Sequence, residues 1–317
     1  MRRVVIADPL GADGVALLRR ELEVVEAIGE VGLAEALPEA EGLVVRSRTK
    51  VTAEMLANSG RLRVVGRAGI GVDNIDVPAA TRRGILVINA PQGSVRAVAE
   101  HTLALIFALA RRVVAADRSV RDGSWKAGYE GMQLAGKRLG IIGAGKIGRA
   151  TAAMAVAIGM DIVAYDPYVP DTLWPDLGLQ AFGLRELLAS SDVVTLHVPL
   201  SSETRGLLGA GELRSMKTGA ILVNCARGGL VDEAALGDVL REGRLGGAAL
   251  DVFEEEPVAP GSPLLAAPNL ILTPHVAAST PEAQAQIATD LAGDILRFFA
   301  GCPVSSPVNP SVLEKVS

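Results

Sequence analysis

The chain has 317 residues, of which 49% are hydrophobic and 21% are charged, and these are the proportions of a globular protein. A net charge of −5 is unfavourable for a broad nucleic-acid-binding surface, and two cysteines, Cys225 and Cys302, are too few for a disulfide framework. We therefore expect a cytoplasmic protein of about two domains that binds no nucleic acid. The most apolar helical stretch, residues 102–110, is far shorter than the roughly 20 residues that span a bilayer. The apolar run after the N-terminal arginines is too short for a signal peptide, so we expect no membrane association.

Short apolar runs rich in β-branched residues alternate with helical stretches in the first ninety residues. Helices are predicted over about 11–20, 52–59 and 76–83. The predicted strands lie, in chain order, within RRVVIAD (2–8), EGLVVRS (41–47), LRVVGRAG (62–69) and GILVINAP (84–91).

The alternation resumes after a long predicted helix that runs from Ser94 to about Arg121. Six further strands are predicted within RLGIIGAG (138–145), DIVAYDP (161–167), DVVTLHVP (192–199), AILVNCA (220–226), GAALDV (247–252) and NLILTPH (269–275). Pro281 opens a last predicted helix over about 281–300. Continuous apolar strands separated by helices are typical of parallel sheets that are covered on both faces. We therefore predict an α/β fold with two doubly wound parallel-sheet domains.

A Gly-x-Gly-x-x-Gly motif, Gly143, Gly145 and Gly148, follows one predicted strand and opens an alanine-rich helix. Gly143 permits a tight turn, Gly145 lets the backbone approach a pyrophosphate, and Gly148 allows close packing of helix and strand. The helix N-terminus favours the anion through its free N–H groups. The next predicted strand ends at Asp166, whose carboxylate would accept hydrogen bonds from a ribose and repel a 2′-phosphate. The motif predicts binding of NAD in preference to NADP.

Charged and ionisable side chains follow the later predicted strands. In open α/β sheets ligands bind outside the carboxyl ends of the strands, and those ends carry Val198–Pro199, Arg227, residues 251–256 and His275. A guanidinium at the end of a buried strand is costly unless it meets an anion, so we interpret Arg227 as a carboxylate clamp. Hydride transfer between NAD and a hydroxy acid needs such a cation. It also needs an acid/base for the hydroxyl proton and a group that sets the pKa of that acid/base.

The chain has three histidines, which differ in context. His101 lies in a long apolar helix and His197 lies within a strand, and we interpret both as structural. His275 follows Pro274 at a strand end and is the candidate acid/base. Glu256 closes DVFEEEP and is its candidate partner, because a carboxylate beside a histidine stabilises the imidazolium.

Eight stretches, in order over nearly the whole chain, resemble the D-isomer-specific 2-hydroxyacid dehydrogenase family. They are VRSRTKVT, VVGRAGIGVDNIDVPAAT, GILVINAP, AEHTLALIFALAR, GKRLGIIGAGKIG, VNCARGGLVDE, AALDVFEEEP and TPHVAAS. The resemblance implies a catalytic set formed by Arg227, Glu256 and His275. It also implies a Rossmann NAD-binding domain, residues 92–280, inserted into a flavodoxin-like substrate domain built from 1–91 and 281–317.

The resemblance implies NAD as cofactor, a small 2-hydroxy or 2-oxo acid as substrate, and no metal. The expected cofactor-binding residues are Gly143, Gly145, Lys146, Ile147, Gly148, Asp166, Val198, Pro199, Cys225, Ala226, Asp251, His275, Ala277 and Ala278. The expected substrate-binding residues are Arg46, Ser47, Ala68, Gly69, Ile70, Arg227 and His275. The family's homodimers form through the cofactor domain, so we expect a homodimer, possibly assembled into a tetramer, in which the predicted helix over 94–121 contacts the partner.

The identity of the hydroxy acid stays open. Arg46 and Arg48 follow a predicted strand at a spacing of two and are interpreted as a phosphate-binding pair, with surface charge as the alternative. Ile70 stands where family members that act on a phosphorylated substrate often have Thr or Ser. Lys126 is the only basic residue in GSWKAGYEG, where such members can have several. We expect a short form without the carboxyl-terminal regulatory domain that many of those members carry.

Through the resemblance we favour an enzyme for a phosphorylated 2-hydroxy acid, and we weigh it against three alternatives. One is a reductase for glyoxylate, hydroxypyruvate or another 2-keto acid. Another, outside the enzymes, is an NAD-sensing binding module like the corepressors that share this fold. Formate dehydrogenases share the fold as well, but they pair the histidine with Gln, and Glu256 is unfavourable for that assignment.

Overall fold

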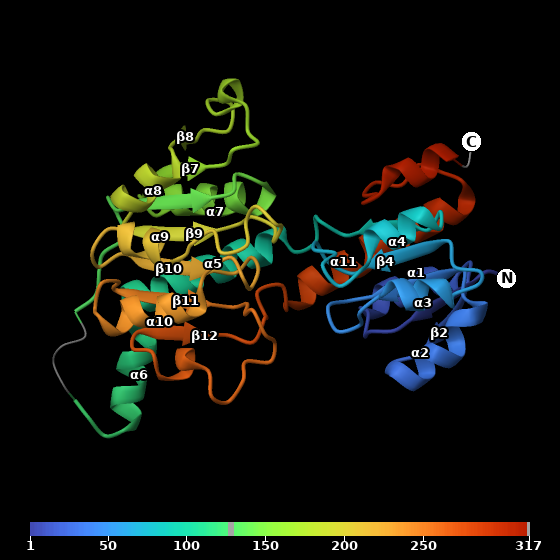
Figure 1. The fold of residues 1–317 in the computed structure, drawn as a ribbon, viewed down its shortest axis with the longest axis horizontal. Coiled ribbons are helices and arrows are strands. Elements are labelled where there is room, and N and C mark those ends of the chain that lie inside the picture. The colour runs from blue at the N-terminus through green and yellow to red at the C-terminus, as the bar shows by residue number, and fades with distance from the viewer. Residues whose placement is uncertain (126–129, 316–317) are drawn as a thin grey trace. The chain divides into compact units, whose positions relative to one another are not determined.

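The computed structural model describes residues 1–125 and 130–315 of the chain. It divides into two compact units, Met1–Ser94 with Ser279–Ser317 (unit 1) and Val95–Ala278 (unit 2). Each unit is built on a parallel sheet with helices on both faces, which confirms the predicted fold class (Figure 1). Among the residues described, no helix combines the length and the apolar character needed to cross a bilayer.

Unit 1 contains a five-stranded parallel sheet in the order β2-β1-β3-β4-β5, the flavodoxin-like order. Its strands are β1 (Arg3–Ile6), β2 (Glu23–Glu26), β3 (Gly42–Val45), β4 (Val64–Arg67) and β5 (Leu86–Asn89). Its helices are α1 (Ala12–Arg19), α2 (Glu30–Ala36), α3 (Ala53–Ala57), α4 (Val77–Arg82) and α11 (Pro281–Ala300), with 3-10 turns η1 (Leu37–Glu39) and η4 (Pro310–Lys315). The strand β2 was not predicted, because its two valines are flanked by glutamates and, as an edge strand, it is only partly buried.

Successive residues of the buried strands point to opposite faces of the unit 1 sheet. Val4 of β1 packs with α1 and α11 in one apolar layer, whereas Val5 packs with α2, α3 and α4 in the other. Side-chain caps fix where several helices begin: Thr52 accepts a hydrogen bond from Met55 N and Asp76 accepts one from Ala79 N.

Unit 2 contains a seven-stranded parallel sheet in the order β12-β11-β10-β9-β6-β7-β8. Its strands are β6 (Arg138–Ile142), β7 (Asp161–Tyr165), β8 (Gln180–Ala181), β9 (Val193–Leu196), β10 (Ile221–Asn224), β11 (Gly247–Leu250) and β12 (Leu270–Leu272). The strand order reverses between β6 and β9, which creates the topological switch point where doubly wound sheets bind dinucleotides. The two-residue strand β8 was not predicted from the sequence.

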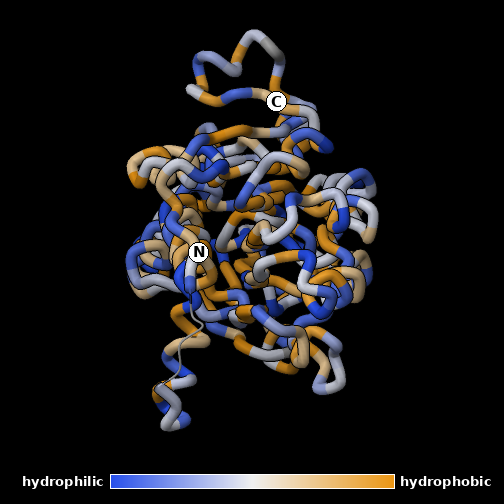
Figure 2. Tube along the Cα trace, turned by 90° about the vertical axis from the view of Figure 1, so that its left-hand side faces the viewer, coloured by the Kyte–Doolittle hydropathy of each residue, from blue (hydrophilic) through white to orange (hydrophobic). Residues whose placement is uncertain are grey.

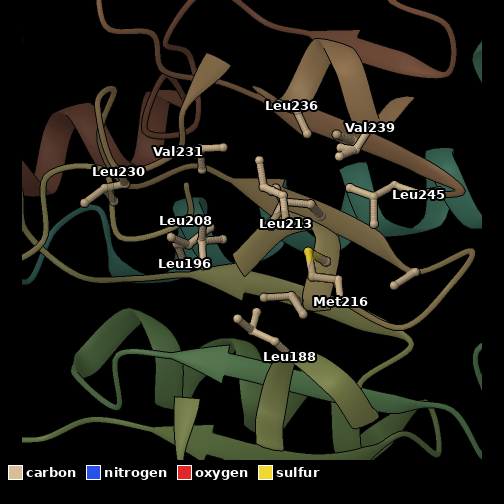
Figure 3. Packing of buried hydrophobic residues seen from close by; sticks show 14 of the residues in the cluster. Leu188, Leu196, Leu208, Leu213, Met216, Leu230, Val231, Leu236, Val239 and Leu245 are labelled. Atoms are coloured by element: carbon tan, nitrogen blue, oxygen red, sulfur yellow. The ribbon is translucent and has the colours of Figure 1, made fainter. Parts of the chain in front are cut away.

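Two apolar layers cover the unit 2 sheet. One contains side chains of α5 (Val95–Ala110) and α7 (Lys146–Ala157). The other contains side chains of α8 (Leu184–Ser190), α9 (Ala210–Ser215) and α10 (Glu233–Arg241), and Figure 3 shows Leu188, Leu213 and Leu236 from these helices packed in it. The turns η2 (Asp171–Leu173) and η3 (Pro263–Ala266) complete the unit. In the hydropathy-coloured trace of Figure 2, hydrophobic stretches run through the interior and hydrophilic ones through many outer turns.

The single long helix predicted over 94–121 is wrong. The structure has two helices, α5 ending at Ala110 and α6 (Val113–Arg121), because Arg112 adopts a left-handed conformation with φ of 52°. The carbonyl of Ala110 accepts a hydrogen bond of 2.7 Å from Met132 N, a residue of the segment that follows the second helix. A distant segment thus satisfies the end of α5, and the apolar pattern of the sequence carries no sign of that contact.

Candidate active site

The glycine motif closes a tight turn between β6 and α7 at the switch point. Gly143 has a φ of 101°, and a Cβ added there would lie 2.7 Å from the carbonyl oxygen of His197. A Cβ on Gly148 would lie 2.1 Å from the carbonyl oxygen of Gly143, whereas one on Gly145 would meet nothing within 4 Å. Gly143 and Gly148 are therefore required by packing, while Gly145 leaves open space at the N-terminus of α7, where Lys146 and Ile147 begin the helix. This arrangement fits a bound pyrophosphate.

Asp166 follows β7 and is hydrogen-bonded to the glycine turn. Its Oδ2 accepts from Ala144 N at 3.0 Å, and its Oδ1 accepts from Tyr168 N at 3.0 Å. The half-buried carboxylate is held beside the turn that would carry the pyrophosphate, where its remaining lone pairs suit ribose hydroxyls.

Other expected cofactor contacts also follow strands of unit 2. They are Val198 and Pro199 after β9, Cys225 and Ala226 after β10, and Ala277 and Ala278 after β12. Burial raises the pKa of the Cys225 thiol to about 12, so Cys225 is a neutral apolar side chain rather than a nucleophile.

His275 and Glu256 are in direct contact. The His275 Nδ1 atom lies 2.8 Å from Glu256 Oε2, and Glu256 Oε1 accepts a hydrogen bond of 3.1 Å from Phe253 N. Burial acts against ionisation of Glu256, but the hydrogen bond and charge of His275 outweigh it, and the pKa of Glu256 is lowered. An ionised carboxylate only accepts hydrogen bonds, so Nδ1 carries a proton and Nε2 is the atom left to exchange one with a ligand.

Asp251, at the end of β11, fixes the backbone around His275. It is fully buried, and it accepts hydrogen bonds of 2.6 Å from Thr273 Oγ1 and of 2.9 Å from both Val276 N and Ala277 N. His275 between them has a positive φ of 54°, a conformation that a side-chain-bearing residue adopts only when its surroundings enforce it. Asp251, expected from the sequence to bind the cofactor, therefore also orders the loop that presents His275. The sequence pattern did not reveal this role.

His101 on α5 lies against this buried carboxylate. Its Nε2 is 3.6 Å from Asp251 Oδ1 and 3.3 Å from Thr273 Oγ1. Burial raises the pKa of Asp251, but the hydrogen bonds from His101, Thr273 and the following amides outweigh it, so the pKa is lowered. The histidine interpreted as structural from sequence thus supports the loop that carries His275.

His197 is chemically different from His275. Burial lowers the pKa of His197 to about 4, and its Nε2 lies 3.2 Å from Thr195 Oγ1. It is neutral near pH 7 and is not part of the His275 cluster. Over residues 1–125 and 130–315, no group of three or more His, Cys, Asp or Glu side chains is placed to hold a metal ion.

The turn that carries Arg227 is folded around Asn224, a residue that the sequence analysis did not single out. The buried Asn224 side chain accepts from Ala226 N at 3.0 Å and donates to the Arg227 carbonyl oxygen at 2.8 Å. Arg227 itself is half-buried, and its Nη1 donates to the Ala226 carbonyl oxygen at 2.6 Å. The guanidinium is thus held close to the end of β10.

Gly228 brings the Arg227 turn against the segment that leads to Glu256. A Cβ on Gly228 would lie 1.8 Å from the carbonyl oxygen of Phe253 and 2.6 Å from the backbone nitrogen of Glu254. Only glycine permits this approach of two backbones, and it links the turn of one expected catalytic residue with the loop of another.

Gly228→Ala is expected to lower kcat/KM by about 100-fold, because the methyl group forces the two backbones apart and misplaces both Arg227 and Glu256. Steady-state kinetics tests this, with Gly211→Ala as the matched control because an added Cβ there meets nothing within 4 Å. Equal kinetics in the two variants would show that the approach of the two loops is unimportant.

The expected substrate residues of unit 1 follow two paired strands. Arg46 and Ser47 come directly after β3, and residues 68–70 come directly after β4, with Val45 and Arg67 in register. Arg46 is half-buried, whereas Ser47 and Arg48 are exposed. Lys126 lies outside the residues that the structure describes.

The chain is similar to known proteins over almost its whole length. A model of the D-isomer specific 2-hydroxyacid dehydrogenase NAD-binding domain matches residues 103–277. A D-3-phosphoglycerate dehydrogenase from Archaeoglobus fulgidus is 45% identical over 98% of the chain and 60% of its own length. Among solved structures, a protein from Thermus thermophilus has a TM-score of 0.89 at 38% identity, covering 96% of this chain and 99% of that one. A D-lactate dehydrogenase from Aquifex aeolicus, complexed with NAD and lactic acid, has a TM-score of 0.84 at 28% identity and covers 99% and 98%.

The chain belongs to the D-isomer specific 2-hydroxyacid dehydrogenase family, as the resemblance of its motifs predicted, and it contains that family's NAD-binding domain. It spans about 60% of the length of the curated relatives it matches.

Proposed function

We propose that the protein is an NAD-dependent D-2-hydroxyacid dehydrogenase that interconverts D-3-phosphoglycerate and 3-phosphohydroxypyruvate. The observation that carries the proposal is the 2.8 Å contact between His275 and Glu256, at the strand ends of an NAD-binding domain. Arg227, on the turn that Gly228 joins to the Glu256 loop, supplies the cation that a carboxylate substrate needs.

The three residues have separate tasks in the proposed reaction. Arg227 binds the substrate carboxylate and polarises the 2-oxo group. When bound, NADH supplies the hydride that adds to C2. His275 donates its Nε2 proton to the oxygen on C2, and the Glu256 carboxylate stabilises the charged imidazole before that transfer. In the oxidising direction His275 accepts the hydroxyl proton at Nε2.

The phosphorylated substrate is favoured by two observations. The curated relatives that are 41–45% identical over at least 96% of the chain are named D-3-phosphoglycerate dehydrogenases. In this sequence, Arg46 and Arg48 follow β3 in unit 1, and we assign Arg46 to the substrate's phosphate end. Ile70, in place of a hydroxyl-bearing residue, leaves fewer side-chain donors in the neighbouring loop.

A substrate panel tests the proposal. Rates of NADH oxidation are compared for 3-phosphohydroxypyruvate, hydroxypyruvate, glyoxylate and 2-oxoglutarate, and again with NADPH. We expect the highest kcat/KM with 3-phosphohydroxypyruvate and NADH, because Asp166 repels a 2′-phosphate. A preference for hydroxypyruvate or glyoxylate would assign the protein to the 2-keto-acid reductases instead, and absence of turnover with every acid would contradict an enzymatic role.

We also infer a homodimer formed through the NAD-binding domain. The helix α6 extends beyond the β12 end of the unit 2 sheet and carries exposed Val113, Val114 and Val120, with Trp125 92% exposed just after it (Figure 1). Exposed apolar side chains gathered on one element are typical of a protein interface. Light scattering that gives the mass of a single chain would contradict the dimer.

A further inference from the structure

A buried carboxylate holds the loop that contains Arg46. Asp8 lies two residues beyond the end of β1 and is only 4% exposed. Its Oδ2 accepts hydrogen bonds from Arg46 N at 2.6 Å and from Thr49 N at 3.3 Å, so the two ends of the loop converge on one oxygen. Burying a carboxylate is unfavourable unless such donors compensate for its lost hydration, so Asp8 and the loop depend on each other.

Asn74 holds the same loop through its carbonyl groups. Its Nδ2 donates to the Arg46 oxygen at 2.7 Å and to the Thr49 oxygen at 2.6 Å. Its own backbone oxygen accepts from Val51 N at 2.7 Å. Arg46 is therefore fixed at both its N–H and its C=O group, by two residues that lie 38 and 28 positions away in the chain.

These contacts also join the two loops expected to bind the substrate. Asn74 belongs to the segment that follows β4 and begins with Ala68–Ile70, whereas Arg46 and Thr49 follow β3. A parallel bridge between Val51 and Ile75 continues the connection. Within unit 1, the loop that follows β4 and the loop that contains Arg46 are thus joined by hydrogen bonds.

We propose that Asp8 and Asn74 are positioning residues that set the specificity for an anionic substrate tail. The inference rests on the proposed function, in which Arg46 binds that tail. An arginine side chain loses considerable rotamer freedom when it binds a ligand. If the backbone that carries it is already fixed, no further backbone entropy is lost on binding. We call the hydrogen bonds of Asp8 and Asn74 to the Arg46 loop the Asp8–Asn74 clamp. With this clamp intact, Arg46 meets the tail from a preorganised loop. Without it, the loop must be ordered by the substrate, which weakens binding of tail-bearing acids and leaves hydride transfer unchanged.

Two pairs of variants of the full chain separate this role from general stabilisation. Asp8→Ala removes the shared acceptor, whereas Asp8→Asn keeps an oxygen that can accept from both N–H groups. Asn74→Asp replaces the donating amide NH2 group with an oxygen that faces two carbonyl oxygens, and Asn74→Ala removes the side-chain amide. Asp13→Asn, at an exposed position of α1, is the matched control.

We expect Asp8→Ala and Asn74→Asp to raise KM for 3-phosphohydroxypyruvate by roughly tenfold, with kcat, the Kd for NADH and KM for hydroxypyruvate each changed less than about twofold. Asp8→Asn and the control should stay near the wild type. Should Asp8→Ala fail to fold, Asn74→Ala gives the same readout with Asp8 in place. The proposed role of Asp8 and Asn74 would be overturned if KM rose equally for both acids, if kcat fell, or if no kinetic constant changed.

Arg46→Ala distinguishes the clamp from the function on which it rests. If Arg46→Ala raises KM for 3-phosphohydroxypyruvate selectively and the clamp variants do not, the clamp is wrong and the proposed function stands. If the wild type shows no preference for any acid with an anionic tail, both are wrong.

Discussion

Replacing His275 with asparagine is expected to lower kcat by about 10²–10⁴-fold, the usual contribution of a positioned general acid. Asparagine tolerates this left-handed position, but its side-chain amide is not acidic enough to transfer a proton to the oxygen on C2. The Kd for NADH, measured by fluorescence titration, should change less than about twofold, because the glycine turn and Asp166, which we expect to bind the distal part of the cofactor, are unaltered. Near-normal single-turnover rates would remove His275 from the mechanism.

Neighbouring carboxylates provide a matched control for this assignment. Glu255 and Glu256 are both exposed, but it is Glu256 whose Oε2 lies 2.8 Å from His275 Nδ1. In the proposed reduction His275 donates a proton, and the ionised Glu256 accepts a hydrogen bond from its Nδ1 atom. Glu256→Gln should therefore lower kcat for reduction, and Glu255→Gln should leave kcat near the wild-type value. The pKa of Glu256 is lowered in the folded protein, so its contribution to stability is present above its ordinary pKa and is lost as the pH falls through the lowered value.

Arg227→Lys is expected to lower kcat/KM by about 30- to 5,000-fold, equivalent to about 2–5 kcal/mol of lost interaction with a carboxylate. Lysine keeps the charge but cannot reproduce the planar pair of N–H donors, and its shorter head group does not reach the same position from the turn held by Asn224.

An Arg-to-Lys change at Arg214 on α9 controls for the loss of a guanidinium elsewhere in unit 2. Arg214 pairs with Glu242 at the surface, where such pairs contribute little, so its variant should match the wild type. If Arg227→Lys did the same, the carboxylate would have to be bound by another group.

The fold class could be predicted because buried parallel strands leave continuous apolar runs. VVIA, GLVV and ILVN are each buried on both faces in the structure, and each appears in the sequence as an uninterrupted run between helical stretches. The edge strand β2 was not predicted because it is only partly buried and flanked by glutamates, and β8 was not predicted because it has two exposed residues. The break between α5 and α6 at Arg112 was not predicted, because it involves Met132, twenty positions later, whose N–H donates a hydrogen bond to the last carbonyl of α5.

Part of the candidate site could be predicted in the same way, since ligand residues follow strand ends and the glycine motif has a defined spacing. The residues that hold those groups in place could not. Asp8 and Asn74 act through hydrogen bonds to backbone atoms of distant segments, Asn224 through bonds to the backbone of its own turn, and Thr273 through a bond to the side chain of Asp251. No local pattern distinguishes these residues from ordinary turn residues. Asp251 was selected as a cofactor residue, and only the three-dimensional structure gave its bonds to the amides that follow His275.

Above all, this site is proposed to direct a hydride to C2 of a 2-oxo acid and so to give a D-2-hydroxy acid. The most direct test is to reduce 3-phosphohydroxypyruvate with NADH deuterated at the transferable C4 position and to analyse the product by chiral chromatography and mass spectrometry. We predict D-3-phosphoglycerate with one deuterium at C2 and no deuterium lost to water. An L-configured product, or a product without deuterium at C2, would contradict the account.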